Sequence, residues 1–233
     1  DPFSQDEQAF AQSKETLMMQ LKCGVAAGAI ALFVGLAGTP VALAQDAWTS
    51  YTATLTPLNA AVTGSQAQAE ASFTVVGDQL TIKISATSVP PSIEHLQHFH
   101  GFAEGDQKPT CPVAESDSNG DGVIAIKETE ATAGTTMVPF QDDPVGLEIV
   151  VDTYPTADAT GSYSYEKTVP LQALQAAFAG KFGGQQLDLD RRVVFIHGVP
   201  ATTALADSVA SLGDIPAQVT IPIACGEIHK VAN

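Results

Sequence analysis

Short stretches in which apolar and polar residues alternate, separated by turn residues, constrain the fold of this chain most strongly. From Leu80 to Ser88 aliphatic residues alternate with polar ones, so one face of an extended segment would be apolar. A second such stretch, Ala69 to Val76, precedes it, and the intervening Gly77-Asp78 is typical of a tight hairpin turn. A period of two residues fits a strand rather than a helix. This region therefore predicts a β-hairpin with one buried face.

Similar stretches recur along the chain and predict an all-β fold. Further strands are expected at Trp48 to Leu58, Ile93 to Gly101, Leu147 to Asp152, Gly161 to Val169, Leu187 to His197 and Ala217 to Ala224. Leu171, Leu174 and Phe178 follow helical spacing, with Gly180 as the expected C-cap, so one short helix is predicted. Residues 102–145 are rich in Gly, Pro, Asp and Thr and are expected to be mostly loop. Many short strands joined by such loops are typical of a β-sandwich or barrel.

The first 44 residues have the pattern of an export signal. Asp1 to Thr16 is a polar leader, and a basic residue then precedes the uncharged run Val25 to Gly38, which is followed by the small-x-small sequence Ala42-Leu43-Ala44. A transmembrane anchor is the alternative, because the uncharged stretch Cys23 to Gln45 is long enough to cross a bilayer. Its Gly and Pro content and its cleavage-like end favour removal. We therefore expect a secreted or periplasmic protein with no membrane span after removal of the signal.

Length and charge indicate what remains after removal of residues 1–44. The remaining 233 − 44 = 189 residues, 45–233, suit a single domain with a hydrophobic core. The whole chain has 26 acidic and 10 basic residues, a formal net charge of −16. This charge disfavours nucleic acid and anionic membranes as partners and favours the binding of cations. No Gly-rich phosphate loop, Ser-His-Asp signature or Cys-x-x-Cys pair occurs in the sequence, so no catalytic or organic-cofactor residue is assigned.

The cysteine count fits an oxidising compartment. Of the three cysteines, Cys23 belongs to the predicted signal, which leaves Cys111 and Cys225. A pair of cysteines in an exported protein predicts one disulfide. It would close a loop of roughly a hundred residues, worth about 4–5 kcal/mol in the chain-entropy model.

Three of the five histidines lie in the single run His95-Leu96-Gln97-His98-Phe99-His100. On a strand, His98 and His100 point to the same face, which forms half of a metal site, and both copper and zinc accept imidazole nitrogen. His95 has the opposite parity and is expected to be a hydrogen-bonded structural residue. The alternative for the whole run is a set of hydrogen-bonded histidines without a metal.

A twelve-residue segment, Asp117 to Glu128, fits the EF-hand calcium loop. The expected ligands are the side chains of Asp117, Asn119, Asp121 and Glu128 and the backbone carbonyl of Val123. Gly122 stands at the sharp turn of the loop. Pro109 and Pro112 leave no room for a full entering helix, and no second loop is present to pair with this one. An acidic surface turn is the alternative, but we expect an isolated structural calcium loop with an affinity of about 10⁻⁴ to 10⁻³ M.

The histidine run resembles that of the Cu/Zn superoxide dismutase family, whose His-x-x-His-x-His run supplies two copper ligands from its last two histidines. That resemblance implies copper at His98 and His100, with His197 as the later copper histidine after an apolar strand. The family also ends in an Ala-Cys-Gly strand, similar to Ala224-Cys225-Gly226, whose cysteine pairs with one in the position of Cys111. It implies a Greek-key β-sandwich or flattened barrel. Pro90-Pro91 and the His-x-His-Gly sequence at His98 are also similar to CHRD domains.

The departures from the dismutase pattern limit what the resemblance implies. No histidine occurs between His100 and His197, so the family's bridging histidine and its further zinc ligands have no counterpart. Pro222 stands where the family has an arginine that attracts superoxide. Two expectations follow: an exported superoxide dismutase-like protein that binds copper and calcium but dismutates poorly, or a non-catalytic CHRD-like extracellular module stabilised by calcium and a disulfide.

Overall fold

The computed structural model describes residues 48–105 and 107–232, and the predicted leader and signal, residues 1–44, lie outside them. The strands are β1 (Trp48–Pro57), β2 (Gln68–Val76), β3 (Gln79–Thr87), β4 (Gln97–Gly101), β5 (Thr135–Pro139), β6 (Tyr163–Pro170), β7 (Val193–His197), β8 (Pro222–Glu227) and β9 (His229–Lys230). The helical segments are α2 (Ala60–Thr63), α3 (Ile126–Ala133), α4 (Leu171–Lys181), α5 (Ala217–Thr220) and the 3₁₀ turns η1 (Ala114–Ser116) and η2 (Leu189–Arg191).

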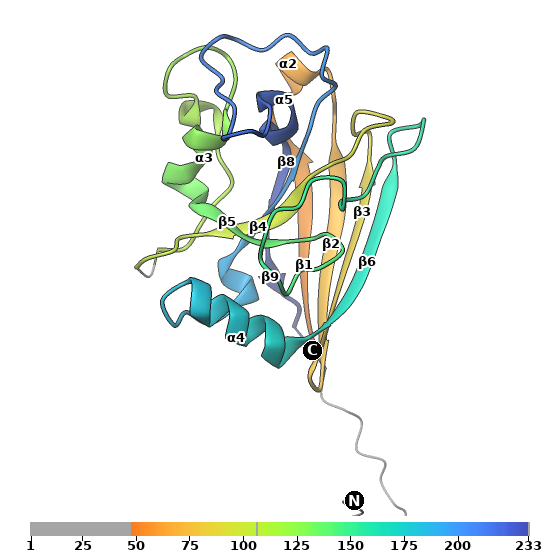
Figure 1. Cartoon of the computed structure of the whole chain (residues 1–233), viewed down its shortest axis with the longest axis vertical. Helices are drawn as coiled ribbons and strands as arrows, with labels where there is room; N and C mark the ends of the chain where they lie inside the picture. The colour runs from red at the N-terminus through yellow and green to blue at the C-terminus, as the bar shows by residue number, and fades with distance from the viewer. Residues whose placement is uncertain (1–47, 106, 233) are drawn as a thin grey trace, which may run out of the picture. The chain divides into compact units, whose positions relative to one another are not determined.

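One antiparallel sheet dominates the fold and curls into a half-barrel (Figure 1). Its strand order is β5-β4-β7-β8-β1-β2-β3-β6, with β9 paired to β1. Strand β1 joins the two halves of the curl, because residues 48–55 pair with β2 while Thr56 and Pro57 pair with β8. The prediction of an all-β fold is therefore confirmed.

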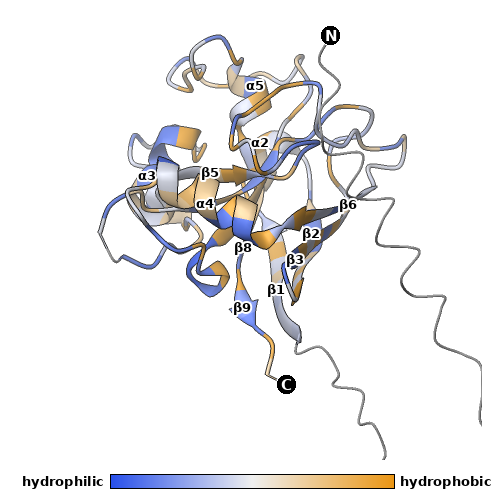
Figure 2. Ribbon diagram, turned by 60° about the horizontal axis from the view of Figure 1, so that its bottom comes forward, coloured by the Kyte–Doolittle hydropathy of each residue, from blue (hydrophilic) through white to orange (hydrophobic). Residues whose placement is uncertain are grey.

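The predicted hairpin is formed by β2 and β3, whose register pairs Val76 with Gln79 across the two-residue turn. Gly77 has φ 55°, in the left-handed region that glycine enters without strain. The apolar residues of this hairpin, such as Phe73 and Ile82, are buried in the main core, and Figure 2 shows the alternation of hydropathy along the strands. One face of each strand lies on the concave, buried side of the sheet. This explains why apolar residues recur at every second position.

Helix α4 confirms the predicted helix and fixes one end of the half-barrel. Leu174 and Phe178 are fully buried in the core. The hairpin turn caps the helix, because the backbone N–H of Leu171 donates to the Asp78 carbonyl and that of Gln172 donates to the Asp78 carboxylate, at 2.9 and 2.8 Å. None of the helices in the described residues is long and apolar enough to cross a bilayer.

Gly180 is not the C-cap that the sequence predicted. The helix runs through Gly180 to Lys181, and the backbone N–H of Phe182 still donates to the Phe178 carbonyl. Phe182 is buried and contacts the Phe178 ring at a centroid distance of 4.8 Å, and this packing extends the helix beyond Gly180. Tertiary packing therefore overrides the local stop signal.

Two of the predicted strands are wrong in whole or part. Leu147 to Asp152 forms no strand, because the buried carboxamide of Gln141 bonds the Glu148 carbonyl and the Val150 N–H in place of a neighbouring strand. Residues 217–220 form α5, and the strand begins only at Pro222.

Two further stretches also differ from their predictions. The stretch predicted as a strand from Leu187 forms η2 first and becomes β7 at Val193. Residues 102–145 also contain α3 and β5 in addition to loop.

Candidate metal centre

Strands β4 and β7 place three histidines on the convex, outward side of the sheet. Phe99 on β4 and the β7 residues Val194 and Ile196 face the main core, so the residues between them face outward. His98 and His100 occupy two such positions on β4, and His197 ends β7. His98 and His100 therefore share one face, as their spacing predicted, and the pairing of β4 with β7 brings His197 beside them.

The three imidazoles form a compact group, which we call the histidine trio. His98 lies in the middle, with ring centroids 4.8 Å from His100 and 4.6 Å from His197. One ring nitrogen from each residue can be chosen so that all three lie within 4.8 Å of one another. Nitrogen ligands of one ion lie about 3.5 Å apart when each bond is about 2 Å long, so a small rotation of the rings would complete a site. Among the described residues, no other group of three His, Cys, Asp or Glu side chains converges in this way.

Four ring nitrogens of the trio are buried without a hydrogen-bond partner: both nitrogens of His98, Nδ1 of His100 and Nε2 of His197. The three histidine residues are only 1–3% exposed. A buried polar group without a partner costs about 1–3 kcal/mol, so four of them in contact would be unfavourable. A metal ion is the ligand that several converging imidazole nitrogens accept.

Neighbouring groups fix the orientation of the outer two rings. His197 Nδ1–H donates to the Thr220 carbonyl at 2.7 Å, which leaves Nε2 as the bare nitrogen facing the trio. His100 Nε2 lies 3.1 Å from the hydroxyl of Thr136 on β5, which leaves Nδ1 for the site. Such second contacts hold metal-binding histidines in one tautomer and one orientation. Thr136 and Thr220 were not predicted, because their contacts with the trio depend on strand register and on a helix of four residues.

Burial keeps the trio neutral. Desolvation lowers the pKa of His98 well below 6.5, with the neighbouring histidines adding to the effect. Desolvation also lowers the pKa of His100 to about 3 and that of His197 to about 4. Neutral imidazole is the form that binds metal, so the site needs no deprotonation at neutral pH.

His95 is a structural residue, as its parity predicted. Its Nδ1 lies 2.9 Å from the His197 carbonyl and its Nε2 lies 2.8 Å from the Pro90 carbonyl. The ring also stacks on Tyr163 at 5.8 Å. His95 therefore supports the backbone that carries the third ligand.

The segment 117–128, which we call the acidic loop, makes a sharp turn at Gly122, where the EF-hand pattern has its glycine. Gly122 has φ 85°, and the Asp117 carboxylate accepts the amides of Gly120, Asp121 and Gly122. Asn119 and Asp121 each accept an amide two residues further on. Helix α3 follows as the exiting helix, and only the 3₁₀ turn η1 precedes the loop.

Glu128 closes the acidic loop on itself. Its Oε1 accepts the amides of Ser118 and Asn119, while its Oε2 accepts the amide of Ala125 at the start of α3. The Ser208 hydroxyl donates to the Asp121 carboxylate, and this bond is the main reason that the pKa of Asp121 is lowered. The carboxylates of the loop thus point to amides and a hydroxyl, and they do not converge as the trio does. Val123, the predicted carbonyl ligand, is buried on the body of the protein.

The two cysteines within the described residues are joined. Cys111 and Cys225 form a disulfide with Cα atoms 5.8 Å apart, across a sequence separation of 114 residues. Cys225 lies on β8 opposite Phe195, in a small outward cluster that also contains Ala133 of α3. The bridge therefore attaches the segment before the acidic loop to the strand beside β7.

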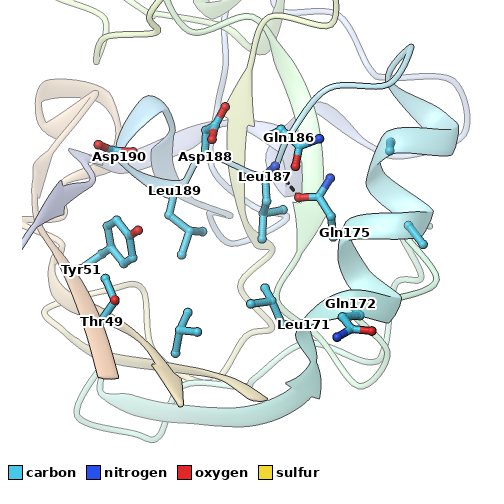
Figure 3. A pocket seen from close by; sticks show the side chains of 13 residues that line it. Thr49, Tyr51, Leu171, Gln172, Gln175, Gln186, Leu187, Asp188, Leu189 and Asp190 are labelled. Atoms are coloured by element: carbon cyan, nitrogen blue, oxygen red, sulfur yellow. Dashed lines mark hydrogen bonds between the residues drawn. The ribbon is translucent and has the colours of Figure 1, made fainter. Parts of the chain in front are cut away.

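A separate pocket of about 580 Å³ lies between β1, α4 and the segment around η2. Figure 3 shows Tyr51 and Leu189 on its wall, facing Leu171 and Leu187. Partial burial and the nearby carboxylates raise the pKa of Tyr51. None of the trio lines this pocket, so it is not an entrance to the candidate metal centre.

Comparison with protein-family models and with curated proteins found no match to this chain.

Proposed function

We propose that this protein is an exported metal-binding protein that holds a copper ion at His98, His100 and His197. The observation that carries the proposal is that His98, His100 and His197 each bring one ring nitrogen within 4.8 Å of the others, in a buried group in which four ring nitrogens have no hydrogen-bond partner. A metal ion would satisfy nitrogens that the surrounding protein leaves without partners.

The donor set fits a borderline or soft ion. Three neutral imidazoles and no carboxylate suit copper or zinc, whereas calcium and magnesium require oxygen. Within the site, His98 would be the central ligand, and Thr136 and Thr220 would hold the outer rings. Bound copper would supply one-electron redox chemistry.

A superoxide dismutase-like Greek-key sandwich is the fold that we propose for this architecture. Support comes from the strand order, in which β4 and β7 are neighbours although about ninety residues separate them, and from the bridge between Cys111 and the last long strand. The missing bridging histidine and Pro222 in place of the guiding arginine argue for weak dismutation.

A non-catalytic, CHRD-like extracellular module is the second candidate, and the burial of the trio from solvent favours it. The 1–3% exposure of the three histidine residues leaves little access for a substrate, so a metal there would have a structural role.

We further propose that the acidic loop binds calcium in a structural role. A carboxylate oxygen has two lone pairs, and Asp117 Oδ2 and Glu128 Oε2 each accept only one amide, so each keeps a lone pair that can coordinate a cation. The turn at Gly122 and the closure of the loop by Glu128 support this proposal. The export signal in residues 1–44 supports a secreted or periplasmic location, where calcium is abundant.

Thermal unfolding of the purified protein with and without each ion tests both sites. Copper should raise the midpoint in the native protein and have little effect on His98→Ala or His197→Ala, because an ion that binds the native state stabilises it. Millimolar calcium should raise the midpoint of the native protein and of Glu130→Gln, but have little effect on Glu128→Gln. Glu130 is the matched control, since it is an exposed glutamate on the same helix.

Metal analysis after gel filtration gives the stoichiometry. One copper retained per chain, and none in His98→Ala, would support the trio. A protein that retains no copper, and whose unfolding midpoint copper does not change, would contradict the proposed copper site. Calcium binding alone would then leave the non-catalytic module.

A further inference from the structure

The histidine trio faces outward from the sheet and yet is buried, so other parts of the chain must cover it. The segment 107–134, which we call the cover, contains the acidic loop and α3 and ends next to His100. Ala133 at the end of α3 is fully buried against Phe195, whose ring contacts His100 at 4.6 Å. Gly134 packs so closely on the Gly101 carbonyl that a Cβ atom would lie 2.2 Å from it.

The cover is attached to the body at both ends. The disulfide joins Cys111 to Cys225, and the backbone N–H of Thr110 donates to the Thr132 carbonyl at 2.9 Å. At the other end the chain runs from α3 through Gly134 into β5, where Thr136 contacts His100. Movement of α3 would therefore be transmitted directly to one ligand.

Asn59 fastens the middle of the cover. Its side-chain oxygen accepts the Ile124 amide at 2.8 Å, and its side-chain nitrogen donates to the Ile124 carbonyl and to the Pro222 carbonyl, both at 2.9 Å. Asn59 has φ 53°, a left-handed conformation that asparagine tolerates. Both backbone polar groups of Ile124, in the acidic loop, are thus satisfied by one side chain that also holds β8.

The contact at Pro222 lies beside the third ligand. Pro222 pairs with His197 in the β7–β8 ladder, and Thr220, two residues earlier, supplies the carbonyl that orients the His197 ring. The backbone N–H of Gly198 donates to the Ile221 carbonyl at 3.0 Å, which completes the connection. The acidic loop is therefore connected to the trio indirectly by two routes, through α3 and Phe195 to His100 and through Asn59 and β8 to His197.

We propose that the acidic loop is a cation-dependent latch on the histidine site: a divalent cation in the loop stiffens the cover, and Asn59 transmits this to β8, so that the metal at the trio exchanges more slowly. This inference rests on the proposed metal binding at both sites. A loop that is ordered by a cation favours the closed arrangement, and two sites that favour the same arrangement are coupled.

The test is the rate at which Zn²⁺ leaves the trio. The protein is freed of calcium on a chelating resin and loaded with one equivalent of Zn²⁺. Transfer of the zinc to a chromophoric chelator with little affinity for calcium is then followed with and without millimolar calcium. Calcium should slow the transfer by about fivefold or more in the native protein and in Glu130→Gln, and should not slow it in Glu128→Gln.

Asn59→Gly isolates the latch, because glycine keeps the left-handed backbone and removes only the side chain. Zinc should leave this variant faster than the native protein, with no response to calcium. Asp152→Gly is the matched control, since Asp152 is exposed and also left-handed, with φ 72°. It should behave as the native protein does.

Equal transfer rates in the native protein and Asn59→Gly would overturn the latch. Calcium that raises the unfolding midpoint but leaves zinc transfer unchanged would also overturn it, while both metal sites of the proposed function would stand. Faster transfer in Asn59→Gly, combined with a native protein that ignores calcium, would contradict the role of the cation. Retention of neither zinc nor copper would instead contradict the proposed function.

Discussion

His98 combines burial with two unpartnered nitrogens, so acidity should affect this residue and its neighbours directly. A histidine in the unfolded chain titrates near pH 6.5, whereas burial lowers the pKa of His197 to about 4 in the folded protein. Between these values the unfolded state binds protons that the native state cannot. The metal-free protein should therefore lose stability as the pH falls through this window, by about 2 kcal/mol for each neutral histidine between pH 6.5 and 5. Urea unfolding across this pH range measures the effect.

Two variants separate the trio from the other histidines. His98→Leu replaces a ring that has no hydrogen bond with an apolar side chain, so it should abolish metal binding, raise the stability of the metal-free protein and reduce the pH dependence. His229→Ala removes an exposed histidine and should leave both metal binding and the stability of the metal-free protein unchanged. A metal-free protein whose stability is constant from neutral pH to pH 5 would contradict burial of neutral imidazoles.

The sequence was sufficient to predict the residues whose position depends on a strand alone. The period of two residues placed His98 and His100 on one face and His95 on the other. It could not predict the role of Asn59. This residue has a left-handed backbone, and its side chain contacts partners that lie 65 and 163 residues further along the chain. Nor could the sequence predict Thr220, because only the β7–β8 register brings its carbonyl to His197. Long-range contacts of single polar side chains carry no periodic signal.

At the scale of elements, the Cys111–Cys225 bridge joins the cover to β8 and should contribute strongly to stability. Closing a loop of 114 residues corresponds to about 5 kcal/mol in the chain-entropy model. We expect the double variant Cys111→Ser/Cys225→Ala to unfold at a clearly lower temperature than the native protein. Peptide mapping without reductant should first show the linked pair in the purified protein. Two free thiols, or an unchanged unfolding midpoint in the double variant, would contradict this role of the bridge.

Elements with a periodic pattern of apolar residues could be predicted from the sequence. Elements whose backbone conformation depends on contacts with a distant part of the chain could not. The β2–β3 hairpin and α4 follow from alternation and helical spacing. The segment from Leu147 lacks a strand because the Gln141 side chain replaces the ladder, and α5 forms where an apolar run suggested a strand. An EF-hand pattern implies an exiting helix, so α3, whose first turn contains Glu128, was a missed element for which the sequence held a signal.

For the whole molecule, net charge decides how readily an anion could reach the trio. Residues 1–44 hold four acidic and two basic residues, so the remainder holds 26 − 4 = 22 acidic and 10 − 2 = 8 basic residues, a formal charge of −14. A field of this sign repels superoxide. Favourable steering raises association rates by about 10–10³-fold, and this chain lacks that advantage.

We therefore predict that the copper-loaded protein dismutates superoxide slowly, and that added salt raises the rate. Screening weakens long-range repulsion between the acidic protein and the anion, which is the opposite of the salt effect on a positively steered enzyme. The near-complete burial of the trio limits access as well. The rate is measured over a range of ionic strength, with copper-treated His98→Ala as the background for loosely bound copper. Fast dismutation that falls with salt would show that residues outside the recognised pattern guide the anion and replace the missing groups.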